Sequence, residues 1–438
     1  MKPFEIIRAN LFWLIDFILG SKVRRNYNDI KFIFNYSKDH RSIEKKEQYL
    51  DNLLKHSTNY VPFYKPYKNY VSLQNFPVID KNIIRNRFDD FVAQNYKIKK
   101  MHSVTTSGST GTPFKIYQDK KKRLRHIADN IFFDELAETK IGSRIYYFRV
   151  WNEMIKKNKL ICLMENLIPL DTSKLDDTAI ERNLINRIKR DKSSITILAY
   201  ASTLETFAKY LKKNYKYPFK STIHSIISQS ETLSDDARKE LGYFFSSKVV
   251  SRYSNMENGF IGQQCFSGNG EYHLNEASFY VEILNFNNDT PVKNGEMGRI
   301  VITDLFNYGM PLIRYDTGDI GTLGKKANCE IDNKILTRIE GRRTDFISDT
   351  NGNLLSPHVI TNTMWKYDEI HQFQFVQEKM NAYTIIINVG KNRFEKEDDL
   401  INEIKNYIGF DANISIKYVE EIPLLNSGKR KKIVNKIN

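Results

Sequence analysis

A glycine-rich loop between two predicted strands places the first limit on the fold. "HSVTTS" and "FKIYQD" each alternate polar and apolar side chains, as strands do, and "GSTGTP" joins them. Asp119 then suits the N-cap of a helix that continues through "KKKRLRHIADNIFFDELAE". The order strand, loop, strand, helix indicates a β-hairpin whose loop is dense in hydroxyl groups.

This order excludes the common nucleotide-binding loops. A Walker-type phosphate loop runs from a strand directly into a helix and contains Gly-Lys-Ser/Thr, which is absent here. "GNGEYH" lacks the third glycine of the dinucleotide fingerprint, and "SGSTG" is not the Gly-x-Ser-x-Gly elbow of hydrolases. Two interpretations of the loop stay open: an ordinary polar hairpin, or one that holds anionic oxygens with hydroxyls and backbone amides.

The rest of the chain alternates strands with helices. Strand-like "SITILAY" and "SIISQSE" are followed by the helix "SDDARKELGYFF" and the strand "KVVSRYS". After "EGRRTDFIS", a strand, a helix and a strand are predicted at "AYTIIINV", "KEDDLINEIKNYIG" and "ISIKYVEEIPLL". These patterns predict a mixed α/β fold with two domains, a large one over residues 1–344 and a small one over residues 345–438.

The N-terminal stretch is apolar but interrupted by charges at Glu5, Arg8 and Asp16, so it is too short for a membrane span. Apolar residues recur at helical spacing: Phe4, Ile7, Leu11, Leu14 and Ile18. Basic residues follow at Lys22, Arg24 and Arg25. The pattern fits a helix packed on the protein body and, alternatively, a helix that lies at a membrane surface.

The net charge is strongly positive and unevenly distributed. A formal charge of +15 favours acidic partners such as nucleotides, phosphopantetheine, an acidic carrier protein or a lipid surface. Residues 346–438 contain 12 basic and 12 acidic residues, so the surplus lies before them. No helix-turn-helix, zinc finger or aromatic-basic repeat is visible, which argues against a nucleic-acid partner.

Basic residues are dense just after the loop, and we expect most of them to form a solvated helix face, with attraction of a polyphosphate as the alternative. They are Lys115, Lys120, Lys121, Lys122, Arg123 and Arg125. The three cysteines, Cys162, Cys265 and Cys329, lack the spacing of a zinc motif and fit a reducing cytoplasm without a disulfide framework. Cys265 and His273 are compatible with a shared metal, although two isolated ligands are more often ordinary interior residues.

Five segments occur in an informative order: "TTSGSTGTP", "SQSETLS", "SRYSNMENG", "MPLIRYDTGD" with "EGRRTDFI", and "NSGKRKK". Together they resemble the adenylate-forming superfamily of acyl- and aryl-CoA ligases. Within it, the chain is most similar to the phenylacetate-CoA ligase-like branch, which includes the CapK-type proteins of capsular polysaccharide biosynthesis. "VPFYK", "FPVIDKNIIRNRF", "AYASTLETFAKYL" and "YHLNEASFYVEIL" extend the resemblance over almost the whole chain.

The resemblance implies a large adenylation domain followed by a small, mobile C-terminal lid. It also implies a cytoplasmic enzyme that uses ATP and Mg²⁺ to join a carboxylic acid to AMP, with release of pyrophosphate. The acyl group would then pass to a thiol of CoA or an acyl-carrier protein, or to an amine, in the biosynthesis of capsule or O-antigen polysaccharide. The acid and the acceptor are not identified by these motifs.

The resemblance assigns nucleotide contacts to three of the segments. The β- and γ-phosphates would be held by Thr105, Thr106, Ser107, Gly108, Ser109, Thr110 and Gly111. The adenine pocket would be lined by the backbone of Ser230, Glu231 and Thr232. Tyr253 would stack on adenine, and Glu257 would coordinate Mg²⁺, which prefers carboxylate oxygen. Met256 replaces the usual threonine of this segment, which removes one hydroxyl contact.

The remaining assignments concern the ribose, the hinge and the catalytic amine. Asp319 would accept hydrogen bonds from the ribose hydroxyls, and Arg342 would lie near the ribose or the α-phosphate. Thr344 stands where the family commonly has the acidic pivot of domain rotation, and Asp345 is the alternative pivot. Lys429 would bridge the attacking carboxylate and the α-phosphate as negative charge develops.

Two non-enzymatic readings stay open beside this one. The chain could be a nucleotide-binding scaffold of a polysaccharide assembly pathway, or a peripheral membrane protein bound through its N-terminal helix. The joint presence of Glu257, Asp319 and Lys429 favours the enzyme.

Overall fold

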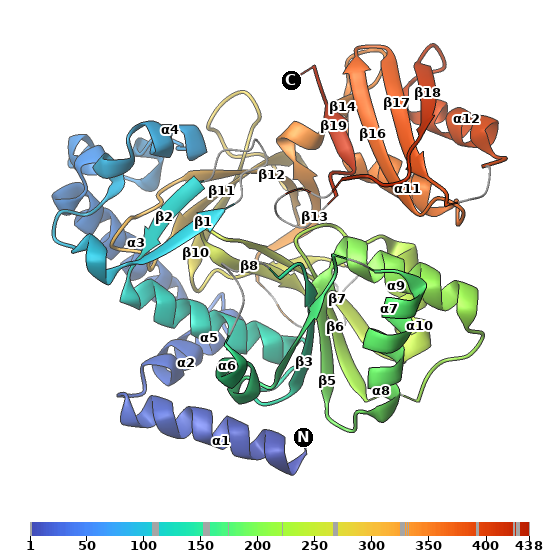
Figure 1. Ribbon diagram of the computed structural model, residues 1–438. Coiled ribbons are helices and arrows are strands. Elements are labelled where there is room, and N and C mark those ends of the chain that lie inside the picture. Colours follow the sequence, from blue (N-terminus) through green and yellow to red (C-terminus); the bar gives the residue numbers. More distant parts are fainter. Residues whose placement is uncertain are drawn as a thin grey trace. The chain divides into compact units, whose positions relative to one another are not determined.

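The computed structural model describes residues 2–106, 114–151, 158–173, 175–220, 222–265, 270–324, 329, 331, 333–390, 394–423, 425 and 430–437. The chain divides into two compact units (Figure 1). Unit 1 comprises Met1–Arg144, Leu163–Asn166 and Val250–Ile339, and unit 2 comprises Ile145–Cys162, Leu167–Val249 and Glu340–Asn438. The predicted domain boundary at residue 344 stays a prediction.

Unit 1 begins with helices. They are α1 (Pro3–Ile18), α2 (Lys22–Asn35), α3 (His40–Tyr60), α4 (Lys81–Asn86) and α5 (Lys120–Leu136). Asp119 caps α5 as predicted, because its side chain accepts a hydrogen bond from the amide of Lys122 at 2.9 Å. α2 packs on α5 through apolar side chains that include Phe34 and Phe132. No helix within the described ranges is long and apolar enough to cross a membrane.

The strands of unit 1 form a hairpin and a larger sheet. The hairpin consists of β1 (His102–Thr106) and β2 (Phe114–Gln118), which confirms the two strands predicted around the glycine-rich loop. In the sheet the strands run in the order β10 (Phe279–Leu284), β11 (Met297–Asp304), β12 (Tyr315–Leu323), β13 (Ile335–Arg342), β9 (Tyr272–Leu274), β8 (Gly259–Gln264) and β7 (Lys248–Asn255).

Unit 2 contains parallel strands with helices, as the alternating pattern predicted. The strand order is β6 (Ile223–Gln229), β5 (Ile195–Tyr200), β3 (Arg144–Arg149) and β4 (Leu167–Asp171). β5 pairs with β6 and β3 with β4, both in parallel. The helices are α6 (Lys159–Met164), α7 (Asp177–Ile180), α8 (Asn186–Arg190), α9 (Ala201–Asn214) and α10 (Asp235–Phe245). One apolar cluster joins the strands to α9 and α10.

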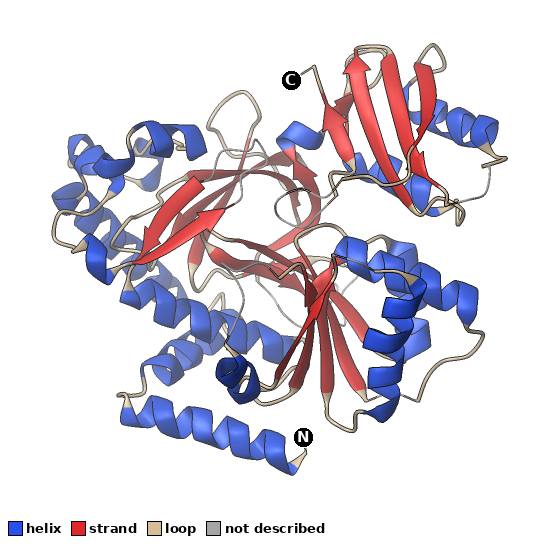
Figure 2. Ribbon diagram, viewed as in Figure 1, coloured by secondary structure: helices blue, strands red, loops and turns tan. Residues whose placement is uncertain are grey.

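The C-terminal part of unit 2 has an apolar core of its own. Its sheet runs in the order β18 (Asn413–Tyr418), β17 (Ala382–Asn388), β16 (Gln372–Lys379) and β19 (Ile433–Asn435), and a small pair is formed by β14 (Ile347–Ser348) and β15 (Leu354–Leu355). α11 (Pro357–Trp365) and α12 (Glu397–Ile408) lie against this sheet (Figure 2). Their apolar side chains join its core. The strand, helix and strand predicted here are confirmed as β17, α12 and β18.

Candidate active site

The turn between β7 and β8 carries Glu257. Asn255 pairs with Gly259 across the hairpin, and the side chain of Asn255 accepts a hydrogen bond from the amide of Asn258 at 2.7 Å. Gly259 has a φ of +92°, and a Cβ at this position would lie 2.4 Å from Nδ1 of His126 on α5. The turn therefore requires glycine both for its backbone conformation and for its close approach to α5.

Glu257 is buried, with 2% of its surface exposed, and is held by two side chains. Its Oε1 lies 2.6 Å from Nζ of Lys81 and accepts a hydrogen bond of 3.1 Å from the hydroxyl of Tyr315. Burial and the neighbouring Glu257 carboxylate raise the pKa of Tyr315 well above its usual value, so this phenol stays a donor. The carboxylate oxygens of Glu257 are the ligand type that Mg²⁺ prefers, and a bound Mg²⁺ would compete with Lys81 for them.

Tyr253 and Asp319 are also brought together. The hydroxyl of Tyr253 on β7 donates a 2.8 Å hydrogen bond to Oδ2 of Asp319 on β12. Burial, followed by the Asp319 carboxylate, raises the pKa of Tyr253 well above its usual value. The amide of Asp319 donates to Oγ1 of Thr317 at 3.1 Å, and the amide of Gly318 donates to Oδ1 of Asp316 at 2.9 Å. These local bonds fix the backbone that presents Asp319.

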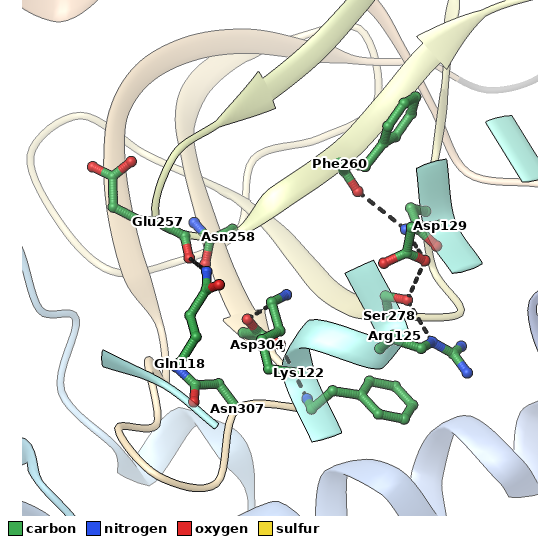
Figure 3. Close-up of polar contacts among 12 residues, drawn as sticks. Gln118, Lys122, Arg125, Asp129, Glu257, Asn258, Phe260, Ser278, Asp304 and Asn307 are labelled. Atoms are coloured by element: carbon green, nitrogen blue, oxygen red, sulfur yellow. Dashed lines mark hydrogen bonds and ion pairs between the residues drawn. The ribbon is translucent and has the colours of Figure 1, made fainter. Parts of the chain in front are cut away.

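The β1–β2 hairpin that carries the glycine-rich loop is linked to the Glu257 turn at the hairpin end away from the loop. Thr105 and Thr106 lie at the end of β1, whereas Ser107, Gly108, Ser109, Thr110 and Gly111 fall outside the described residues. Gln118, at the end of β2, donates a 3.0 Å hydrogen bond to the backbone carbonyl of Glu257 (Figure 3). In the part of the chain that the structure describes, the buried Oγ1 of Thr106 has no hydrogen-bond partner. An unpaired buried hydroxyl beside this loop fits the phosphate-binding interpretation.

The expectation of a solvated basic face on α5 is wrong for two residues. Lys122 is 1% exposed, and its Nζ lies 2.6 Å from Oδ2 of Asp304. Arg125 is equally buried and pairs with Asp29 at 2.7 Å. Asp129, one helical turn further on, accepts hydrogen bonds from Ser278 and Asn275 in the same buried network (Figure 3). These charges stabilise the packing of α5, because a buried charge must be paired.

The predicted adenine-pocket segment lies in unit 2, directly after β6. Ser230 has a positive φ of 73°, which turns the chain sharply at the end of the strand. Glu231 accepts a hydrogen bond of 3.2 Å from the amide of Ser202, in the first turn of α9. Ser234 is the N-cap of α10, since its side chain accepts from the amide of Ala237. The backbone between these points, including Thr232, is thus fixed at both ends.

The hinge and the C-terminal basic segment are also in unit 2. Arg342 ends β13, and Thr344 and Asp345 lie in a short 3-10 turn, η6 (Arg343–Asp345). Asp345 lies 3.6 Å from Nζ of Lys431, and burial raises the pKa of Asp345 despite that cation. Lys429 falls outside the described residues.

Sequence comparisons identify proteins that are similar to this chain. Residues 347–436 match the family described as CapK C-terminal domain. The chain is 25% identical over 386 residues to Protein CapK of Staphylococcus aureus, with 84% of this chain and 81% of that protein covered. It is also 25% identical over 189 residues to the phenylacetate-coenzyme A ligase of Aromatoleum evansii, with 40% and 42% covered.

Solved structures share the fold. 2-Hydroxyisobutyryl-CoA ligase, in the postadenylation state in complex with R3-HIB-AMP, aligns with a TM-score of 0.69 at 14% identity, covering 90% of both chains. The chain thus shares the fold of adenylate-forming ligases and is similar in sequence to a phenylacetate-coenzyme A ligase. ATP-bound MatB of Rhodopseudomonas palustris aligns with a TM-score of 0.56 at 13% identity, covering 78% of this chain and 68% of MatB. The mixed α/β class predicted for the chain is confirmed.

Three side chains of the candidate site were not anticipated from the sequence. Lys81 is the first residue of α4, directly after the N-cap Asp80, and it forms an ion pair with Glu257, which is distant in the sequence. Tyr315 opens "YDTGD", the motif that also contains Asp319, and Gln118 closes β2. Lys81 and Tyr315 lie in segments that carry the family resemblance, so their positions in those motifs could have indicated a role in the site. No motif indicated Gln118.

Proposed function

We propose that this chain is a ligase that uses ATP to adenylate a carboxylic acid and then transfers the acyl group to a thiol, of CoA or a carrier protein, or to an amine. The observation that carries the proposal is the buried Glu257 turn. It is joined through Gln118 to the hairpin that carries the glycine-rich loop and through Tyr315 to the strand that contains Asp319. Three predicted nucleotide contacts therefore belong to one connected framework.

In the proposed reaction, a carboxylate oxygen attacks the α-phosphorus of ATP, and the bond to pyrophosphate breaks. Tyr253 supplies an aromatic face for adenine, and Asp319 accepts from the ribose hydroxyls. Glu257 would hold Mg²⁺, which neutralises phosphate charge when bound. The loop residues Thr105–Gly111 would hold phosphate oxygens, the Ser230–Thr232 backbone would line the adenine, and Arg342 would lie near the ribose or α-phosphate. Lys429 would stabilise the charge that develops between the carboxylate and the α-phosphate.

The residues of the site constrain the acyl acceptor of the second step less than they constrain the nucleotide of the first. In the second step the nucleophile attacks the acyl carbon, and AMP leaves. Relatives of this chain include proteins named phenylacetate-coenzyme A ligase, and one structural neighbour was solved with 2-HIB-AMP and CoA, which supports a thiol. We also propose a role in capsular polysaccharide biosynthesis, which rests on the resemblance to the CapK-type proteins, and Protein CapK of Staphylococcus aureus is 25% identical to this chain. We propose residues 345–438 as the mobile lid of this enzyme.

Carboxylate-dependent exchange of pyrophosphate into ATP tests the proposal across aryl, acyl, amino and uronic acids. We expect exchange with at least one acid, and a loss of about 10² to 10³-fold in Glu257→Gln and Asp319→Asn, by analogy with lost transition-state donors. Asp89→Asn, on the exposed surface, is the matched control and should exchange normally. ATP binding without exchange for any acid would favour the non-catalytic scaffold instead.

A second proposal concerns α1, whose apolar side chains face solvent. Phe4 is 75% and Phe17 71% exposed, whereas Trp13 packs inward and is covered at 3.7 Å by the guanidinium of Arg24. We propose that this apolar face rests on an anionic bilayer beside the basic start of α2. Phe4→Ser with Phe17→Ser should abolish co-sedimentation with phosphatidylglycerol vesicles, and Tyr217→Ser, an exposed aromatic elsewhere, should not. Binding that survives the double change contradicts the proposal.

A further inference from the structure

Three potential metal ligands meet in unit 1, apart from the residues assigned to the nucleotide. They are Cys265, His273 and Cys329, whose ligand atoms all lie within 4.8 Å of one another. Cys265 directly follows β8, His273 is the middle residue of β9, and Cys329 lies between β12 and β13. None of the three cysteines of the chain is in a disulfide.

Strand pairing explains how these distant residues meet. His273 is the cross-strand partner of Gln263 on β8 and of Ile335 on β13. Cys265 follows the pair Gln264–Tyr272 on one side of β9, and the segment that precedes β13 leads into the pair Ile335–His273 on the other side, so both come close to His273. Sequence spacing could not show this, because the three ligands become neighbours only through the sheet.

The orientation of the imidazole is suited to metal binding. His273 is 1% exposed, and its Nδ1 lies 2.6 Å from Oδ1 of Asn333. Since an amide oxygen can only accept, Nδ1 carries the proton and the Nε2 lone pair is left for the other side of the ring. Nε2 lies 3.2 Å from Sγ of Cys329. A hydrogen bond that fixes the tautomer of a ligating histidine is the usual outer support of a metal site.

We infer that Cys265, His273 and Cys329 bind a zinc ion that fastens the end of β8 and the segment before β13 to β9. In a tetrahedral zinc site with thiolate and imidazole ligands, the ligand atoms lie about 3.5 to 3.8 Å apart, which the observed cluster reaches by small side-chain rotations. Two thiolates and an imidazole favour Zn²⁺ over Mg²⁺, whose ligands are oxygens.

The ion would have a structural effect on the candidate active site. β8 begins at Gly259, directly after the Glu257 turn, and ends at the residue before Cys265. A metal at Cys265 thus fixes the far end of the strand whose near end positions Glu257. This inference does not depend on the proposed reaction.

Metal analysis of the full chain tests the inference. We expect about one zinc per chain by plasma mass spectrometry. Cys265→Ser and Cys329→Ser should each lose most of the zinc, and Cys162→Ser, at a cysteine of similar burial in α6, should keep it. Zinc content that does not respond to Cys265 and Cys329, or its absence from the purified protein together with a Cys265–Cys329 disulfide, would overturn the inference.

A second measurement does not depend on the folding of any variant. After removal of metal with a chelator, the wild-type chain should bind one Co²⁺ and develop the absorption of thiolate-to-cobalt charge transfer together with tetrahedral ligand-field bands. Zinc should displace the cobalt and raise the melting temperature, because a ligand of the native state stabilises it. A cobalt spectrum without thiolate charge transfer would overturn the inference even if some metal binds.

Discussion

Replacing Gly259 by alanine tests how closely the turn that carries Glu257 is packed. The left-handed backbone at a φ of +92° costs a non-glycine residue about 1–2 kcal/mol. The new Cβ would also lie 2.4 Å from Nδ1 of His126, a distance at which something must move, and such overpacking costs about 1–3 kcal/mol more. The free energy of unfolding should therefore fall by about 2–5 kcal/mol.

Gly295→Ala isolates the backbone part of this effect. Gly295 has a nearly equal φ of +89°, but a Cβ there meets nothing within 4 Å, so only about 1–2 kcal/mol should be lost. Urea unfolding of both variants measures the difference. Adenylation should fall by about 10²-fold in Gly259→Ala alone, because the turn displaces Glu257.

The double variant Gly259→Ala, His126→Ala tests whether contact with the imidazole causes the loss of stability. His126→Ala removes the imidazole that the new methyl group meets, so Gly259→Ala should cost less in that background than in the wild type. If Gly259→Ala is no more harmful than Gly295→Ala, or if His126→Ala leaves its cost unchanged, the close packing of the turn against α5 is not what constrains Glu257.

Three other changes probe unit 2. Lys429→Ala should slow adenylation by about 10² to 10³-fold in rapid-quench assays and should slow acyl transfer from preformed acyl adenylate much less. The control Lys436→Ala, at an exposed lysine, should change neither rate. An equal loss in both steps would contradict the role assigned to Lys429. Thr344→Asp restores the acidic residue at the predicted pivot and should alter the ratio of the two half-reaction rates; identical rates would remove the hinge hypothesis. Burial lowers the pKa of Lys209 to about 8 from its usual 10.5, so the unfolded state binds more protons between these values and stability should rise with pH across this window. Lys209→Met should flatten that rise in urea unfolding, and an unchanged slope would contradict the assignment.

Much of the local structure followed from short-range patterns. Asp119 caps α5 as its sequence position predicted, because a cap acts on amides only two or three residues away. The hairpin β1–β2 followed from the alternation of polar and apolar residues around the loop. Such features depend on the chain within a few residues, so the sequence alone was sufficient to predict them.

Long-range pairing was beyond those patterns. The contact between Lys81 and Glu257 and the burial of Lys122 against Asp304 depend on which surfaces of distant segments meet. A lysine on a helix looks the same in sequence whether it faces water or a buried carboxylate. For Tyr253 and Asp319 the family resemblance supplied the roles, and the structure supplied the hydrogen bond that joins them.

The short strand β19 gives residues 433–435 a structural role. Ile433 aligns with Phe375 in parallel, and the side chain of Asn435 donates a 2.8 Å hydrogen bond to the carbonyl of Phe346. A nonsense codon ahead of position 433 would consequently do more than shorten a tail. It would remove the paired strand that follows Lys429. The shortened protein would keep its proposed nucleotide-binding framework, but β19 would no longer hold the chain next to the proposed catalytic lysine.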